Sequence, residues 1–299
     1  MSKDVFIAPH IDVVFKSIFG NENEKGPLMS LLSSIMELPL ESFEELQLLN
    51  TELIPENVEQ KSSRLDLRIR LKDKTEIDVE IQVINQVAYK ERILYYWAKL
   101  YSGNLKKSET YDKLKKCVVI NIVYFELFKM TRMHTKFQLF ETKENELLTD
   151  HLEIHFLELS KLNAYNRTIE NEVLIDWAEF LSLKKEGDLM ALKDRTDLPE
   201  HLLKAIEKYE SIKDDPDLYY EALNLQMGIM DQIQRLDDAT NKGREEGREE
   251  GREEGIKEGI KEGIKEGIME VAKKMKNNGM DSKTIQENTG LDLETIEKL

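Results

Sequence analysis

The sequence has one cysteine, six prolines and two tryptophans among 299 residues, and no apolar run approaches the length of a membrane span. The lone cysteine, Cys117, excludes an internal disulfide. A transmembrane helix needs about 20 consecutive apolar residues, so no membrane contact is expected. The first residues lack the apolar stretch of a secretory signal. We therefore predict a cytoplasmic protein.

Positive charge is also scarce. Lysine and arginine number 43 against 59 acidic residues, a net charge of −16, which counts against general nucleic-acid binding because such binding depends on phosphate neutralisation. A lysine-rich stretch at residues 99–116 has two readings, a basic rim or ordinary solvated lysines. The phosphate-binding loop, the dinucleotide glycine fingerprint and the nucleophile elbow are all missing from the sequence.

Two runs in the first hundred residues alternate polar and apolar side chains. They cover Arg64–Leu71 and Glu76–Val83, with a short polar stretch between them. Alternation of period two is typical of half-buried strands, and two such runs around a short turn predict a β-hairpin.

The hairpin loop sets which charges face each other. A three-residue loop puts Asp66 opposite Glu80 and Arg68 opposite Asp78, whereas a five-residue loop puts Asp66 opposite Gln82. Like charges directly opposite destabilise a sheet. The first register therefore requires either a protonated carboxyl or a cation, and Mg²⁺ is typically held by one or two carboxylates.

The remaining periodicity indicates an α/β core followed by helices. Helical spacing precedes residue 40, and a strong amphipathic helix spans 89–105. A helix between strands of one sheet is typical of a crossover connection. Strands are predicted at 43–54, 118–124, 136–141 and 152–159, and further helices at 173–181, 202–212 and 219–236.

Four segments together resemble the Rpn family of recombination-promoting nucleases and transposases: His10–Gly20, Leu65–Arg68, Val79–Val83 and Arg92–Tyr96. Aspartate on one strand and Glu-x-Gln on the next resemble the PD-(D/E)xK nuclease core. Gln82 stands where that superfamily usually has lysine, a variant that the Rpn family itself shows. The resemblance implies a mixed central sheet flanked by helices over residues 1–165. The helical pattern that follows predicts a helical extension over 166–240.

The same resemblance implies a metal-dependent DNA endonuclease that hydrolyses phosphodiester bonds in recombination, transposition or defence against foreign DNA. Asp66 and Glu80 would hold Mg²⁺ or Mn²⁺, with the Ile81 carbonyl as a third ligand, and Gln82 would act beside them. Asp12 has two readings, a further metal ligand or the N-cap of the first helix.

Three basic residues near the hairpin are candidates for DNA contact: Arg68, Lys90 and Arg92. For Arg92 the alternative is an ion pair on the helix surface with Glu91 or another neighbour. Two rival functions stay open. One is an inactive, transposase-derived DNA-binding protein, and the other is an interaction protein that works through its helices.

The last part of the chain carries a repeat of period four. Seven glycines recur between Gly243 and Gly267, and isoleucines accompany the later ones. Residues 241–270 are either a helix or a frayed linker, because glycine costs a helix about 1 kcal/mol per residue. Residues 271–299 are similar to a helix-turn-helix unit, with caps at Asp281 and Asp292. We expect packing or a homodimer through this C-terminal region.

Overall fold

The computed structural model describes residues 5–53, 63–64, 66–106, 108–164 and 171–299. Leu65 of the nuclease-like motif and the predicted boundary between residues 165 and 166 lie outside these ranges. The described chain separates into two units, Met1–Asp231 and Gln232–Leu299.

Strands of the first unit form one mixed sheet of six, in the order β1-β4-β5-β6-β8-β7, and a separate pair β2-β3, counted over the described residues. Strands β5, β6 and β8 run parallel, while β4 and β7 pair antiparallel with their neighbours. Their bounds are β1 Gln47–Leu49, β2 Glu52–Leu53, β3 Ser63–Arg64, β4 Leu67–Arg70, β5 Glu76–Gln82, β6 Cys117–Val123, β7 His134–Phe140 and β8 Leu147–Glu158.

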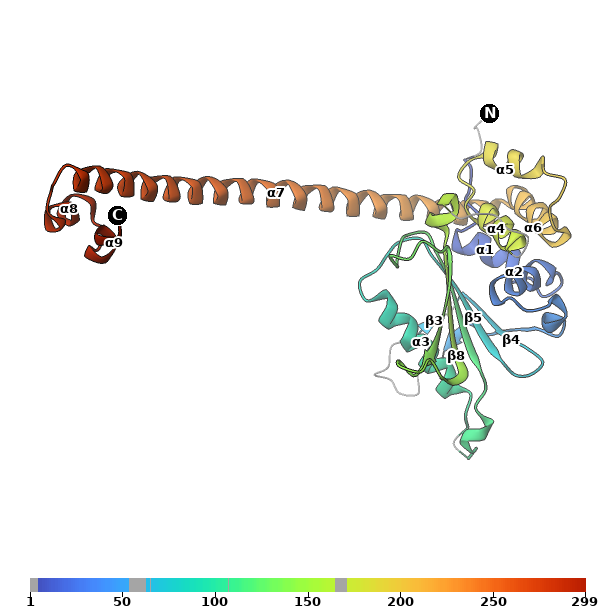
Figure 1. The fold of residues 1–299 in the computed structure, drawn as a ribbon. Coiled ribbons are helices and arrows are strands. Elements are labelled where there is room, and N and C mark those ends of the chain that lie inside the picture. Colours follow the sequence, from blue (N-terminus) through green and yellow to red (C-terminus); the bar gives the residue numbers. More distant parts are fainter. Residues whose placement is uncertain (1–4, 54–62, 65, 107, 165–170) are drawn as a thin grey trace. The chain divides into compact units, whose positions relative to one another are not determined.

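Helices cover both faces of this sheet, with α3 on one face and α1, α2, α4 and α6 on the other (Figure 1). The helices of the first unit are α1 Asp12–Phe19, α2 Gly26–Met36, α3 Tyr89–Gly103, α4 Glu172–Leu181, α5 Glu186–Lys193 and α6 Glu200–Glu210. Short 3-10 turns occupy Leu40–Phe43, Tyr111–Lys113, Leu159–Ala164 and Ser211–Asp214.

The alternating side chains of β5 explain this layering. Ile77 and Val79 enter the main hydrophobic core, which also contains Phe15, Phe19 and Trp177. The residues between them face α3, whose Ile93 and Leu100 join a second core. The predicted α/β architecture, including the crossover helix between β5 and β6, is therefore present. Helix α5 is the element that apolar spacing did not reveal.

The hairpin has the register of the three-residue loop. Leu67 pairs with Val79 and Arg68 with Asp78, which excludes the five-residue alternative. Asp73 supports the turn by accepting hydrogen bonds from the backbone N–H and the hydroxyl of Thr75.

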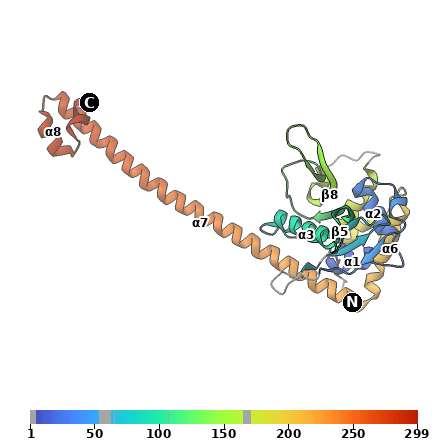
Figure 2. The same ribbon diagram turned by 90° about the horizontal axis from the view of Figure 1, so that it is seen from below.

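Helix α7 spans Pro216–Asn277 and includes the whole period-four repeat, so the repeat is helical (Figure 2). It is followed by α8 (Ser282–Thr289) and α9 (Leu293–Lys298). Asp281 and Asp292 cap these helices as predicted. Ala272, Ile285 and Ile296 form the small core of the second unit. In the described residues no helix combines the length and the hydropathy needed to cross a membrane.

Candidate active site

Asp66 and Glu80 lie next to each other just beyond Leu67 and Val79, the last paired residues of β4 and β5. The backbone N–H of Asp66 donates to Glu80 Oε1 at 3.2 Å. The N–H of Ile81 donates to Asp66 Oδ2 at 2.9 Å. Two cross-strand amides therefore hold the two carboxyl groups on one face.

The charges of these two carboxyl groups are poorly compensated. Glu80 is buried, and burial together with the charge of Asp66 raises its pKa to about 8. Burial also raises the pKa of Asp66, and the charge of Asp12 adds to that effect, while the Ile81 amide opposes it. A cation bound between the groups would favour their ionised forms.

Asp78 adds a third carboxyl group on the same strand face. Its side chain is fully buried, and neither of its oxygens has a hydrogen-bond partner among the described residues. Burial, followed by the charges of Glu80 and Asp66, raises its pKa well above the usual range. Arg68 is opposite Asp78 in register, as the three-residue loop predicts, but among the described residues the two side chains form no hydrogen bond.

Arg68 binds Glu76 instead. Its Nε and Nη2 donate to Glu76 Oε2 at 3.1 and 2.8 Å, and Arg70 Nη2 donates to Oε1 at 2.5 Å. Glu76 is buried, so these two arginines neutralise its charge inside the protein. We call this arrangement of Arg68 and Arg70 around Glu76 the double fork. Arg68 therefore reaches the candidate site with part of its guanidinium already engaged.

Asp12 opens α1 but does not cap it. The N-cap is Ile11 and no side-chain cap bond is made, so the N-cap reading is wrong. Asp12 Oδ1 instead forms an ion pair with Lys16 Nζ at 2.7 Å, and the same Nζ lies 3.2 Å from Asp66 Oδ1. Sequence reasoning missed Lys16, although its spacing of four from Asp12 on a predicted helix was an available signal.

Gln82 is tied to Arg92 of α3. Its Oε1 accepts from Arg92 Nη2 at 2.8 Å, and its Nε2 donates to the Ile84 carbonyl at 3.0 Å. Arg92 Nη1 donates to Gln86 at 2.7 Å, so its hydrogen bonds go to two glutamines and the Glu91 alternative is not what the structure has. The Arg92 guanidinium also lies over the Tyr89 ring, 4.9 Å from the centroid.

Lys90 points elsewhere. Its Nζ lies over the ring of Phe128, 4.7 Å from the centroid. Within the described residues it has no recorded contact with the carboxyl cluster. The Ile81 carbonyl likewise stays a predicted ligand, since the contact that Ile81 makes with Asp66 is through its N–H.

A cleft of about 410 Å³ leads to Asp66. Its wall includes Lys16 of α1, Gly20 just after α1, and Arg68 of β4. The acidic side chains of Glu22 and Asp66 line it too, so the cleft carries charges of both signs.

The donor set fits a hard divalent cation. Among the described residues no three histidine, cysteine, aspartate or glutamate side chains form a ready metal cage. Mg²⁺ does not need one, because it keeps several waters and uses one or two carboxylates. Such an ion would stabilise the ionised forms of Asp66 and Glu80, whose pKa values are raised. Asp78 is buried beside them, and its oxygens have no hydrogen-bond partner among the described residues.

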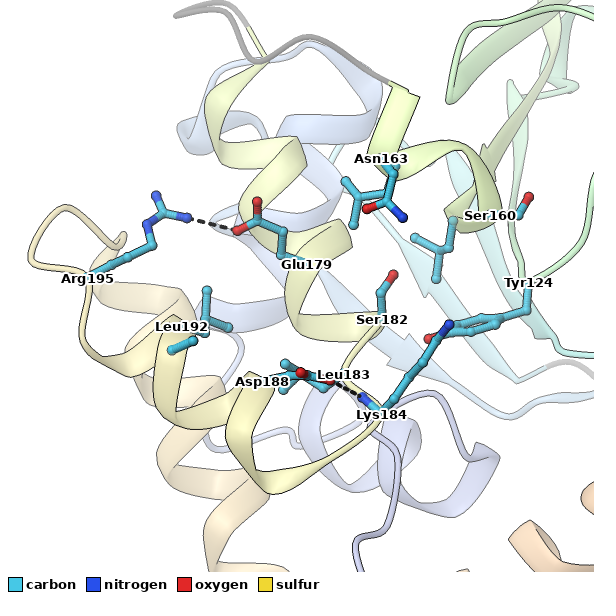
Figure 3. A pocket seen from close by; sticks show the side chains of 13 residues that line it. Tyr124, Ser160, Asn163, Glu179, Ser182, Leu183, Lys184, Asp188, Leu192 and Arg195 are labelled. Atoms are coloured by element: carbon cyan, nitrogen blue, oxygen red, sulfur yellow. Dashed lines mark hydrogen bonds and ion pairs between the residues drawn. The ribbon is translucent and has the colours of Figure 1, made fainter.

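A larger cleft, of about 580 Å³, lies between the 3-10 turn Leu159–Ala164, α4 and α5, with Tyr124 at its edge (Figure 3). Its most basic side chain, Arg195, is already bound by Asp176 at 2.8 Å and by Glu179 at 2.9 Å. None of the residues predicted for catalysis lines it. The smaller cleft at Asp66 is therefore the candidate active site.

Comparison with known proteins gives one result. A family described as PD-(D/E)XK nuclease family transposase matches residues 9–239. No curated protein and no solved structure gives a significant match. The matched region contains the hairpin, α1 and α3, and therefore every predicted site residue.

Proposed function

Because the chain belongs to the PD-(D/E)XK nuclease family transposases, we propose that it is a metal-dependent DNA endonuclease that hydrolyses phosphodiester bonds. The observation that supports this most strongly is the pair Asp66 and Glu80, facing each other with insufficient positive charge. Recombination, transposition and defence against foreign DNA are the roles in which such cleavage is useful.

Asp66 and Glu80 would hold Mg²⁺ or Mn²⁺, with Asp12 and the Ile81 carbonyl as further candidate ligands. When bound, such an ion polarises a phosphate and lowers the pKa of a coordinated water. The protein residues keep the two carboxyl groups on one face through the amides of Asp66 and Ile81. Two backbone hydrogen bonds leave these side chains little freedom, which is how a reactive geometry is preorganised.

In this proposal Gln82 does not take the role of the lysine that usually occupies its position in the superfamily. An amide carries no charge, but its oxygen accepts from Arg92 and so turns a guanidinium toward the end of β5. We assign Gln82 as the positioning residue for Arg92. Arg68 and Arg92 are then candidates for contacting the DNA backbone, while Lys90 lies over Phe128.

Nicking of supercoiled plasmid tests the proposal. With Mg²⁺ or Mn²⁺ the wild type should relax the plasmid, and Asp66→Ala and Glu80→Ala should lose at least about 1,000-fold in rate, which is about 4 kcal/mol of transition-state stabilisation. Glu44→Ala, at an exposed position, is the matched control. Equal nicking by all variants would identify a contaminating nuclease and remove the proposed activity.

We further propose that the repeat of α7 mediates self-association. Ile256, Ile260 and Ile264 are each more than half exposed, at 54%, 59% and 59%. They follow the glycines at a spacing of four, and small residues at this spacing let two helices approach closely. Replacing all three isoleucines by lysine should lower the mass measured by light scattering. An unchanged mass would assign assembly to another surface.

A further inference from the structure

The candidate site lacks the lysine expected two residues after Glu80. Gln82 occupies that position, and both ends of its amide are engaged, the oxygen by Arg92 and the nitrogen by Ile84. An uncharged, engaged amide cannot neutralise the charge that develops on a phosphate in the transition state. A nuclease built on this site needs that positive charge from another residue.

Helix α1 brings such a charge to Asp66. Lys16 Nζ lies 3.2 Å from Asp66 Oδ1, and the side chain is 30% exposed. Asp12, one turn earlier on α1, holds the same ammonium at 2.7 Å. Lys16 also lines the cleft of about 410 Å³ that leads to Asp66, so it faces the space through which a phosphate would approach.

We propose that Lys16 is the cationic residue of this active site and supplies from α1 the charge that position 82 lacks. This inference rests on the proposed nuclease function. Lys16 contacts the phosphate that enters the cleft and stabilises negative charge on its oxygens. Asp12 is its positioning residue, because an ion pair at a spacing of four on a helix restrains the long lysine side chain.

Among the described residues neither arginine pairs with Asp66 or Glu80. Arg68 is bound to Glu76, and Arg92 is bound to Gln82 and Gln86, whereas Lys16 forms an ion pair with Asp66. Lys16 Nζ lies 2.7 Å from Asp12 and 3.2 Å from Asp66, and its side chain, which lines the cleft, is 30% exposed. An ammonium group carries three N–H donors, so it can also contact the oxygen of a phosphate that enters the cleft.

Cleavage at saturating Mg²⁺ gives the first test. Lys16→Met should reduce the rate about 100-fold, the usual cost of removing one donor to the transition state. Lys16→Arg should recover part of this loss because it keeps the charge. The matched control is Lys72→Met, at an exposed lysine of the hairpin loop that pairs with Glu45 and should cleave like the wild type.

Metal affinity separates this role from a structural one. Mn²⁺ binding, followed by calorimetry, should be as tight in Lys16→Met as in the wild type or tighter, since Lys16 shares Asp66 with the ion. A cleavage rate that raising Mg²⁺ restores to the wild-type value would instead mean that Lys16 only assists metal binding. A wild-type rate for Lys16→Met would overturn the proposal outright.

A binding measurement keeps the inference testable if the wild type does not cleave. In Ca²⁺, affinity for a short DNA duplex falls with salt, with a slope of about 0.9 per phosphate contact. Lys16→Met should lower that slope by about one contact, and Asp12→Asn should lower it by less. An unchanged slope in Lys16→Met contradicts the inferred contact, whereas a lowered slope without cleavage in the wild type counts against the nuclease function alone.

Discussion

Buried carboxyl groups at the two ends of β5 differ in whether they are paired with arginine. At one end Glu76 receives both Arg68 and Arg70 in a double fork. Further along the same strand face Asp78 has no hydrogen-bond partner among the described residues, and Glu80 accepts one backbone N–H while its pKa rises to about 8. The strand, the face and the side-chain chemistry are the same, so the difference lies in the placement of cations.

This contrast separates a structural charge from a functional one. Burying a carboxylate is costly unless it is paired, and Glu76 meets that condition within the protein. Asp78 and Glu80 do not, which leaves them dependent on protons or on a bound cation. Buried carboxyl groups with raised pKa values next to Asp66, which lines a cleft, are the pattern expected where a chain keeps a site ready for an ion.

The largest expected effect is the pH dependence of stability without metal. The folded-state pKa of Glu80 is raised to about 8, so the folded protein holds this proton more tightly than the unfolded chain does. The associated stability is present at low pH and is lost as pH rises toward 8, with a slope of up to about 1.4 kcal/mol per pH unit. Urea unfolding in a chelator should show this decline. Glu80→Gln should flatten it, whereas Glu44→Gln should not.

Next in size is the loss of the double fork. Glu76→Gln should lower the free energy of unfolding by about 3 kcal/mol, because it leaves two arginines without their charged partner. Cleavage measured well below the unfolding midpoint should be nearly normal. Equal destabilisation by Glu76→Gln and Glu80→Gln at pH 8 would mean that the two ends of β5 do not differ.

A somewhat smaller effect is expected from added Mg²⁺. At 100 times its dissociation constant a ligand stabilises the folded state by about 2.7 kcal/mol. The gain should grow as pH rises, since the carboxyl groups of Asp66 and Glu80 must lose protons to bind the ion. Thermal unfolding with and without Mg²⁺ at two pH values measures this. A gain that does not depend on pH would place the ion elsewhere.

Asp78→Asn should have the smallest effect. Burial raises the pKa of Asp78, so above the ordinary aspartate pKa of about 3.9 folding requires a proton that the unfolded chain has lost. Replacing this carboxyl group by an amide should therefore add about 1 kcal/mol to the free energy of unfolding at pH 8, and the gain should vanish below about pH 3.9. Destabilisation at both pH values would show that Asp78 has a partner that stabilises its charged form.

The sequence predicted the hairpin and its register because strict alternation and a short loop leave few ways to pair two strands. It did not predict that Arg68 would bind Glu76 rather than Asp78. Opposite and diagonal neighbours on a sheet are both within reach of a long side chain, so the choice depends on packing. The sequence also could not predict the Lys16–Asp66 contact, because this contact depends on how α1 packs against the sheet.

The single cysteine offers a built-in reporter for these experiments. Cys117 begins β6 directly beside Glu76 of β5, is fully buried, and accepts a hydrogen bond from Asn104 at 3.1 Å. Burial raises the pKa of its thiol to about 12, so almost no thiolate exists in the native protein at neutral pH. A thiol reagent should therefore modify the wild type only when the strands separate, and its rate reads out that opening at a natural residue, without an engineered label.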